Sequence, residues 1–141
     1  MNDAQVNLLA NAGAYTRPPD AGDLTMALSI VRQMSVAGIA DLFDESLIAA
    51  EYFLKPAFPN LRCEYIKQNV TPGDRTTKRS RFCEEVSAPL RAHLRTMNQL
   101  DVQLVEHARA EVERRFKLLP NAPERLIDFK ERCSILQQNS C

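Results

Sequence analysis

The chain has 141 residues, 45% of them hydrophobic, and its 18 Lys and Arg residues balance its 18 Asp and Glu residues. This length suits one domain or part of one, and the neutral balance argues against general nucleic-acid binding, which usually needs a basic domain. No apolar run approaches the roughly 18–20 residues that span a bilayer, and the N-terminus shows no signal-peptide pattern.

The first third of the chain predicts one helix between two less regular segments. Residues 1–19 are weakly patterned, and we expect a weakly ordered N-terminal segment with room for one short helix. Residues 20–34 predict a helix, because apolar residues recur at helical spacing and Asp20 and Asp23 suit its N-terminal end. Residues 35–40 are small and apolar, which favours a short buried strand or an extended crossing segment.

A second helix and a second strand are expected in the middle of the chain. The helix begins at Asp41, a suitable N-cap, and continues to about Lys55, before Pro56 stops it. Residues 61–66 predict a short strand that leads into a basic segment. Two isolated strands cannot form a sheet with a core of its own, so either they pair with each other or they belong to a larger sheet.

The last third predicts two helices. Ser87 is expected to cap a long helix from about Ala88 to Lys117. Asp101 falls within the apolar stripe of this helix, and a buried carboxylate needs a partner, so we expect it to accept backbone N–H groups or to pair with a cation. A final helix starts near Pro123, and residues 137–141 are expected to form a frayed tail. The predicted fold class is therefore mainly α, with four to five helices and two short strands.

The chain shows no metal-binding or nucleotide-cradle motif. Its cysteines never form a C-x-x-C pair, so we predict no metal site, while disulfides and reduced thiols both remain consistent with their spacing. The glycines never cluster into a G-x-x-x-x-G-K-[ST] or G-x-G-x-x-G loop. The cysteines are Cys63, Cys83, Cys133 and Cys141, and the glycines are Gly13, Gly22, Gly38 and Gly73.

Positive charge gathers in the segment from Tyr65 to Arg81, which we call the basic segment. It holds five cations against the single acid Asp74, with four hydroxyl side chains between them. Arg, Lys, Thr and Ser are the side chains that bind phosphate or sulfate, so the segment predicts an anion site. The alternative is an ordinary solvated surface loop. The cations are Lys67, Arg75, Lys78, Arg79 and Arg81.

Three stretches resemble motifs of one enzyme family, the sulfotransferases that include the heparan sulfate and uronosyl 2-O-sulfotransferases and many bacterial relatives. Residues 38–47 resemble the family's G-(L/V)-T-E-x-F-D-E-S-L segment, residues 65–73 its Y-x-x-Q-N-V-T run, and residues 98–108 its N-x-L-D-x-x-L-Y-x-x-A helix. Residues 7–13 resemble a degraded N-L-Q-T-R-x-L-x-G segment that lacks the Gln-Thr-Arg. The matches stand in the family's order and cover about residues 36–116.

The resemblance implies an enzyme that transfers a sulfuryl group from 3′-phosphoadenosine-5′-phosphosulfate to a carbohydrate hydroxyl, on an α/β fold with a P-loop-like cradle. It places Tyr65 and Thr71 at the adenosine-phosphate contacts, with Arg75 and Lys78 closest to the family's nucleotide-binding cations. The implied partners are this nucleotide donor and a glycan acceptor, with no metal and no nucleic acid. The setting would be the Golgi membrane or lumen in a eukaryote and the cytoplasm in a bacterium.

Several parts of the family pattern have no match in the chain. The 5′-phosphosulfate loop, the 3′-phosphate Arg and Ser and the histidine base all lie upstream in the family. His93 and His107 do not occupy the place of that base, and we interpret both as structural or surface residues. We therefore expect residues 1–141 to form the C-terminal portion of one sulfotransferase domain, a fragment that is inactive or nearly so by itself, and we assign no catalytic residue.

The competing interpretation is a non-catalytic helical interaction module whose basic segment binds an acidic protein or a sulfated glycan. A fragment would expose helix faces that its missing half covers, whereas an independent module would fold cooperatively without an exposed apolar patch.

Overall fold

The computed structural model describes residues 2–67 and 86–139, and these ranges contain six α-helices, one short 3-10 helix and no strand. The helices are α1 (Ala4–Asn11), α2 (Ala21–Gln33), α3 (Phe43–Leu54), α5 (Ala88–Met97), α6 (Gln99–Lys117) and α7 (Ala122–Gln138), and the 3-10 helix η1 spans Ala40–Leu42. The prediction of a mainly helical chain is confirmed for these residues. None of the described helices combines the length and apolar character needed to cross a lipid bilayer.

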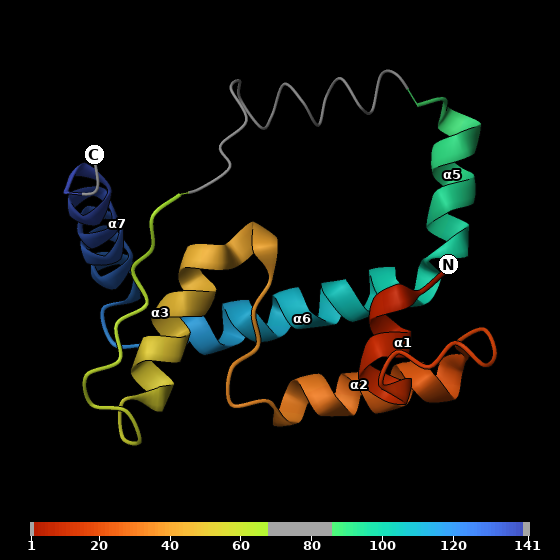
Figure 1. Cartoon of the computed structure of the whole chain (residues 1–141), viewed down its shortest axis with the longest axis horizontal. Helices are drawn as coiled ribbons and strands as arrows, with labels where there is room; N and C mark the ends of the chain where they lie inside the picture. The colour runs from red at the N-terminus through yellow and green to blue at the C-terminus, as the bar shows by residue number, and fades with distance from the viewer. Residues whose placement is uncertain (1, 68–85, 140–141) are drawn as a thin grey trace.

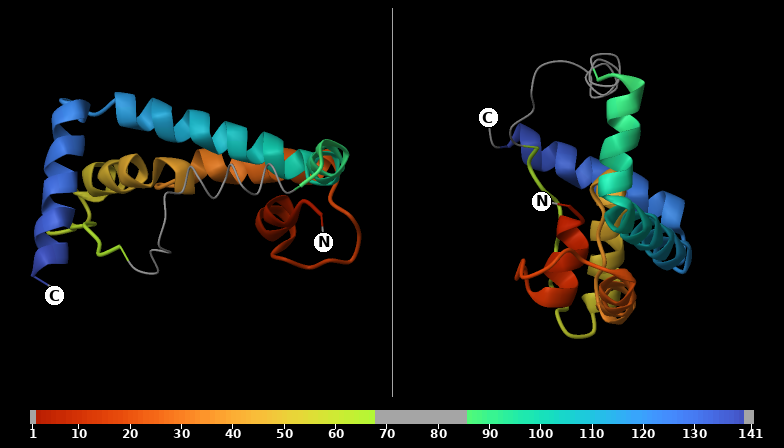
Figure 2. Two further views of the ribbon diagram at one scale, coloured as in Figure 1. Left: turned by 90° about the horizontal axis from the view of Figure 1, so that it is seen from above. Right: turned by 90° about the vertical axis from the view of Figure 1, so that its right-hand side faces the viewer.

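Helix α6 is the spine of the molecule. Helices α2 and α3 lie one after the other along it, α1 and α5 meet its N-terminal end, and α7 crosses near its C-terminal end (Figures 1 and 2). The chain thus forms an elongated arrangement in which residues far apart in sequence meet at the two ends of one helix.

Two separate clusters of buried side chains sit on this spine. The first joins α1, α2 and α6 through Val6, Leu24, Ala27, Val31, Ala37, Leu104 and Val112. The second joins α3, α7 and the turn after α6 through Ile48, Ala49, Leu119 and Phe129. Tyr65 and Cys63 pack at the edge of the second cluster, so this cluster positions the start of the basic segment.

Neither predicted strand forms in the described residues, whereas the alternative prediction for residues 35–40, an extended crossing segment, agrees with the structure. Residues 61–67 and the connection from α2 to η1 are extended, but neither pairs with another strand in the described part of the chain. Side chains provide the hydrogen bonds instead: the N–H of Cys63 donates to Glu51 at 2.7 Å, and the N–H of Ile39 donates to the Ser46 hydroxyl at 3.2 Å. Because these acceptors come from helices, the segments need no sheet partner.

The predicted long helix from Ala88 to Lys117 is two helices, which separate at Asn98. The N–H groups of Leu100 and Asp101 both donate to the carboxylate of Asp3, at 2.9 Å each. They therefore do not continue the backbone hydrogen bonding of α5. Asn98 also accepts the N–H of Asp3 at 3.2 Å through its side chain. Asp3, near the N-terminus of the chain, therefore caps α6, and the segment predicted as one helix forms two. Ser87 caps α5 as predicted, by accepting the N–H of Leu90.

The N-terminal segment, which we expected to be weakly ordered, contains α1 and is anchored to α6. Asp101 accepts the N–H groups of Val6 at 2.8 Å and Gln5 at 3.1 Å, so of the two predicted kinds of partner, backbone donors or a cation, it has the first. Since Asp3 caps α6 in return, the two helix starts cap each other across the structure. Val6 is fully buried as a result of this docking.

The helix ends show which capping predictions hold. Asp20 and Asp23 lie at the N-terminal end of α2 as predicted, and the structure adds that Asp20 caps the helix and forms a reciprocal capping box with Asp23. Asp41 does not cap α3, because η1 intervenes and Asp41 instead pairs with Arg109 of α6. At the other end of the chain, α7 continues to Gln138, two residues into the segment that we expected to fray.

A side chain of α6 also binds the carbonyl oxygens that follow the C-terminal end of α2. Arg115 donates through its guanidinium to the carbonyl oxygens of Met34 at 2.8 Å and Ser35 at 3.1 Å. Glu111 accepts the Nε–H of Arg115 at 2.6 Å and holds the guanidinium in place. Hydrogen bonds from Arg114 and Arg115 lower the pKa of Glu111 to about 2, although burial opposes the shift.

Replacing Glu111 with glutamine is expected to remove part of the acid sensitivity of the fold. A carboxyl whose pKa is lowered on folding stabilises the folded state at pH values above its ordinary pKa. This stabilisation is lost as the pH falls through the folded-state pKa of about 2. We expect Glu111→Gln to cost about 1.5 kcal/mol at pH 7, the lower end for a hydrogen bond to a charged group, and less at pH 3. Urea unfolding at both pH values measures this difference. Glu113→Gln, an exposed neighbour, is the control; an equal loss at pH 3 and pH 7 would contradict the assignment.

Candidate functional site

The structure describes one of the four residues that the resemblance places at the nucleotide. Tyr65 lies in the extended segment between α3 and α7, whereas Thr71, Arg75 and Lys78 lie outside the described residues. Lys67, the first cation of the basic segment, follows Tyr65 in the same extended stretch, and its N–H donates to Gln137 of α7 at 3.1 Å. The described part of the predicted site is therefore fixed against the last helix.

Tyr65 is held by contacts with two helices. Its hydroxyl donates to Asp44, in the first turn of α3, at 2.9 Å. Its ring meets the ring of Phe43 edge to face with centroids 5.0 Å apart, and the ring of Phe129 lies 6.4 Å away on the other helix. A hydrogen bond at one end and aromatic contacts along the ring leave the phenol a single orientation.

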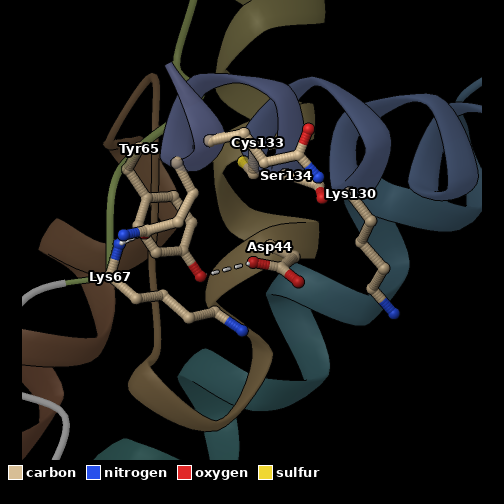
Figure 3. Close-up of a pocket in the computed structure, with 8 residues that line it drawn as sticks. Asp44, Tyr65, Lys67, Lys130, Cys133 and Ser134 are labelled. Carbon is tan, nitrogen blue, oxygen red and sulfur yellow. Dashed lines mark hydrogen bonds between the residues drawn. The ribbon is translucent and has the colours of Figure 1, made fainter. Parts of the chain in front are cut away.

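Tyr65 and Asp44 border a pocket of about 540 Å³ between α3, the extended segment and α7. Figure 3 shows the Tyr65–Asp44 hydrogen bond at its centre, with the ammonium ends of Lys67 and Lys130 on either side. The remaining lining residues come from α7: Cys133, Ser134, Gln137 and Gln138. This volume is in the range of small-molecule sites in proteins.

The pocket carries more positive than negative charge. Among the described residues, neither Lys67 nor Lys130 forms an ion pair, while Asp44 already accepts a hydrogen bond from Tyr65. Two lysines from different elements that face one pocket attract an anion between them.

A network of charges joins the three elements that border the pocket. Arg132 of α7 donates to Glu51 of α3 at 2.8 and 3.1 Å and to Glu64 of the extended segment at 2.6 Å. The hydrogen bonds that Arg132 donates to Glu51, together with the charges of the surrounding carboxylates, raise the pKa of Arg132 further above its ordinary value. Burial alone would raise the pKa of Glu64, but hydrogen bonds and the charges of Arg132 and Arg62 lower it. The network therefore stays charged and holds the segment that carries Tyr65.

The two histidines of the chain lie away from the pocket. His107 lies on α6 and accepts a hydrogen bond from Arg32 at 3.2 Å, and His93 is exposed on α5, so neither lines the pocket. Within residues 2–67 and 86–139, no group of three or more His, Cys, Asp or Glu side chains could hold a metal ion. An ammonium pair beside a fixed aromatic ring can bind a phosphate or sulfate ester of a planar molecule.

Of the residues that line this pocket, sequence reasoning assigned only Tyr65 and Lys67 to a binding site, and it missed both of the other charged residues, Asp44 and Lys130. Asp44 stands inside the first resembling stretch, but nothing in the pattern shows that it would hold Tyr65. Lys130 lies on a helix beyond all the resembling stretches, among other surface charges, so only the packing of α7 against α3 brings it to the pocket. Comparison with models of known protein families, with curated proteins and with solved structures gave no match.

Proposed function

We propose that the chain is part of a sulfotransferase that uses 3′-phosphoadenosine-5′-phosphosulfate to sulfate a carbohydrate hydroxyl, and that it contributes to nucleotide binding. The observation that supports this proposal most is the meeting of two resembling stretches. Phe43 and Asp44, from residues 38–47, both contact Tyr65, the first residue of the stretch 65–73. Two motifs separated along the chain thus build one wall of the pocket.

The third resembling stretch is adjacent to the first. Residues 98–108 contain the N-terminal half of α6, and Ile39 and Leu42 of the first stretch pack against the cluster that includes Leu104 of this half. Asp41 of the first stretch pairs with Arg109, directly after the third. A nucleotide-binding role gives these motifs a common purpose, because α3, which packs against α6, carries both the acid and the ring that orient Tyr65.

The pocket chemistry fits a nucleotide phosphate. Transfer of a sulfuryl group needs cations and donors on the leaving phosphate and a base on the acceptor hydroxyl. Lys67 and Lys130 are suited to the first requirement. No histidine lines the pocket among the described residues, so we assign this chain a share of donor binding and no catalytic residue.

Calorimetric titration of the folded chain with adenosine 3′,5′-bisphosphate tests this proposal. We expect Lys67→Gln and Lys130→Gln each to weaken binding by about tenfold, as expected for loss of one charge-assisted contact of roughly 1.5 kcal/mol. Lys55→Gln, exposed at the opposite end of α3 from Asp44, removes the same charge and should leave binding unchanged.

A parallel variant, Arg75→Ala with Lys78→Ala, tests the two cations that the resemblance assigns. Equal binding by all variants would refute the pocket as the nucleotide site. Absence of binding to a chain that unfolds cooperatively would refute nucleotide binding by this chain alone.

A non-catalytic anion-binding module is the second candidate, and the purely helical character of the described residues favours it. In that case the same lysines would bind a sulfated glycan. Titration with a heparin oligosaccharide separates the two functions: binding that adenosine 3′,5′-bisphosphate does not displace would support the module and count against the sulfotransferase.

A further inference from the structure

Helix α5 presents an apolar stripe that the described part of the chain leaves open. Leu90 and Leu94 are 47% and 43% exposed, and no residue of Ala88–Met97 is buried. The helix stands away from the body and meets it mainly at the start of α6 (Figures 1 and 2). Single exposed apolar side chains are common on protein surfaces, whereas neighbouring ones on one helix face that form a patch with a polar rim mark an interaction surface.

The spacing of the stripe matches the seam of a helix pair. Leu90, Leu94 and Met97 are separated by four and three residues, the repeat of a coiled-coil seam. Three side chains in one line make a narrow contact, whereas a helix that lies in a lipid surface needs a broad apolar face. The pattern therefore favours a partner helix over a membrane.

Charge defines the chemistry of that partner. Arg91 and Arg95 lie along one side of the stripe and His93 along the other, and α5 contains no acidic residue. A second copy of α5 contains only arginine and histidine among its charged residues, so it offers no acid to pair with Arg91 or Arg95. An acidic helix would instead pair with both arginines.

We propose that α5 is the docking site for an amphipathic helix of another protein, whose apolar seam is flanked by acidic residues. Leu90, Leu94 and Met97 provide the apolar contact, and Arg91 and Arg95 select the acidic flanks. This surface is separate from the Tyr65 pocket at the other end of the molecule, so the proposal does not depend on the proposed nucleotide site.

Fluorescence anisotropy with two synthetic helical peptides tests the proposal. Both carry leucine at the seam positions, and the flanks are glutamate in one and lysine in the other. We expect the full chain to bind the glutamate peptide at least about tenfold more tightly than the lysine peptide. Leu90→Gln with Leu94→Gln should weaken binding of the glutamate peptide by about tenfold or more, and Arg91→Gln with Arg95→Gln should remove the preference.

Met26→Gln is the matched control, because Met26 is an apolar side chain 55% exposed on α2. Leu90 and Leu94 are exposed, so their replacement should leave the unfolding midpoint unchanged, and this is measured on the same samples. Equal binding of both peptides, no binding of either, or full binding by the leucine variant overturns the proposal. Binding to phosphatidylserine vesicles without binding to the glutamate peptide would replace the protein partner with a membrane.

Discussion

Replacing Phe129 with alanine is expected to destabilise the chain by about 3–5 kcal/mol, the range for removing a buried aromatic ring from a core. Phe129 is fully buried at the centre of the second cluster, where it joins α7 to α3 and the turn after α6. Its ring also lies beside Tyr65 and beneath the guanidinium of Arg132. The cavity would therefore loosen both the core and one wall of the pocket.

Urea unfolding followed by circular dichroism measures the loss, and the near-ultraviolet signal reports the tyrosine environment because the chain has no tryptophan. Phe129→Leu fills most of the space and should cost less than half as much. Ile127→Ala is the matched control, since Ile127 is 68% exposed on the same helix. A loss below about 1 kcal/mol for Phe129→Ala would show that this cluster is not a core.

Replacing Asp101 with alanine is expected to cost about 2 kcal/mol and to release α1 from α6. The change removes the acceptor of the N–H groups of Gln5 and Val6, the first donors of α1. Loss of a single N-cap costs about 0.5–2 kcal/mol. We expect a loss at the upper end of this range, because Asp101 accepts two N–H groups and one of them belongs to the fully buried Val6. We expect the amide hydrogens of α1 to lose protection while those of α7 keep theirs.

Hydrogen exchange of individual amides measures this effect. Asp101→Asn retains one acceptor oxygen and should lose about half as much stability as Asp101→Ala. Glu106→Ala, an exposed acid on the same helix, should leave α1 protected. If α1 remained protected in Asp101→Ala, the mutual capping would not be what anchors it.

Elements that depend on local signals could be predicted from the sequence. The capping box of Asp20 and Asp23 lies within four residues, and Ser87 is followed by Pro89 and an apolar stripe, so both helix starts are visible in the chain itself. The need of Asp101 for a partner was also predictable, because a carboxylate in an apolar stripe needs one, although the sequence did not decide between backbone donors and a cation.

Elements that depend on distant residues could not be predicted in this way. The separation of α5 from α6 requires Asp3, which is more than 90 residues away in the chain. The extended segment 61–67 has the composition of a strand, but Glu51 and Gln137 satisfy its backbone donors from two helices. Short apolar runs carry no periodicity that distinguishes these outcomes.

The candidate site was visible only in part. The basic segment and the resemblance both point to Tyr65, and Tyr65 does line a pocket. Lys130 and Asp44 become part of that pocket through the packing of α7 and α3, which no spacing in the sequence records. The helices that surround the pocket were thus predictable, whereas the meeting of Lys67 and Lys130 in one pocket was not.

The placement of two small cores on one spine has a consequence for folding cooperativity. Val6 and Leu104 belong to one cluster and Phe129 and Leu119 to the other, so the side chains at one end of α6 do not depend directly on those at the other. Proteins open in contiguous units, each with its own free energy, and distant perturbations are additive. The chain should therefore behave as two semi-independent units: damage at the α1 end would leave the pocket folded, and a ligand in the pocket would stabilise mainly its own half.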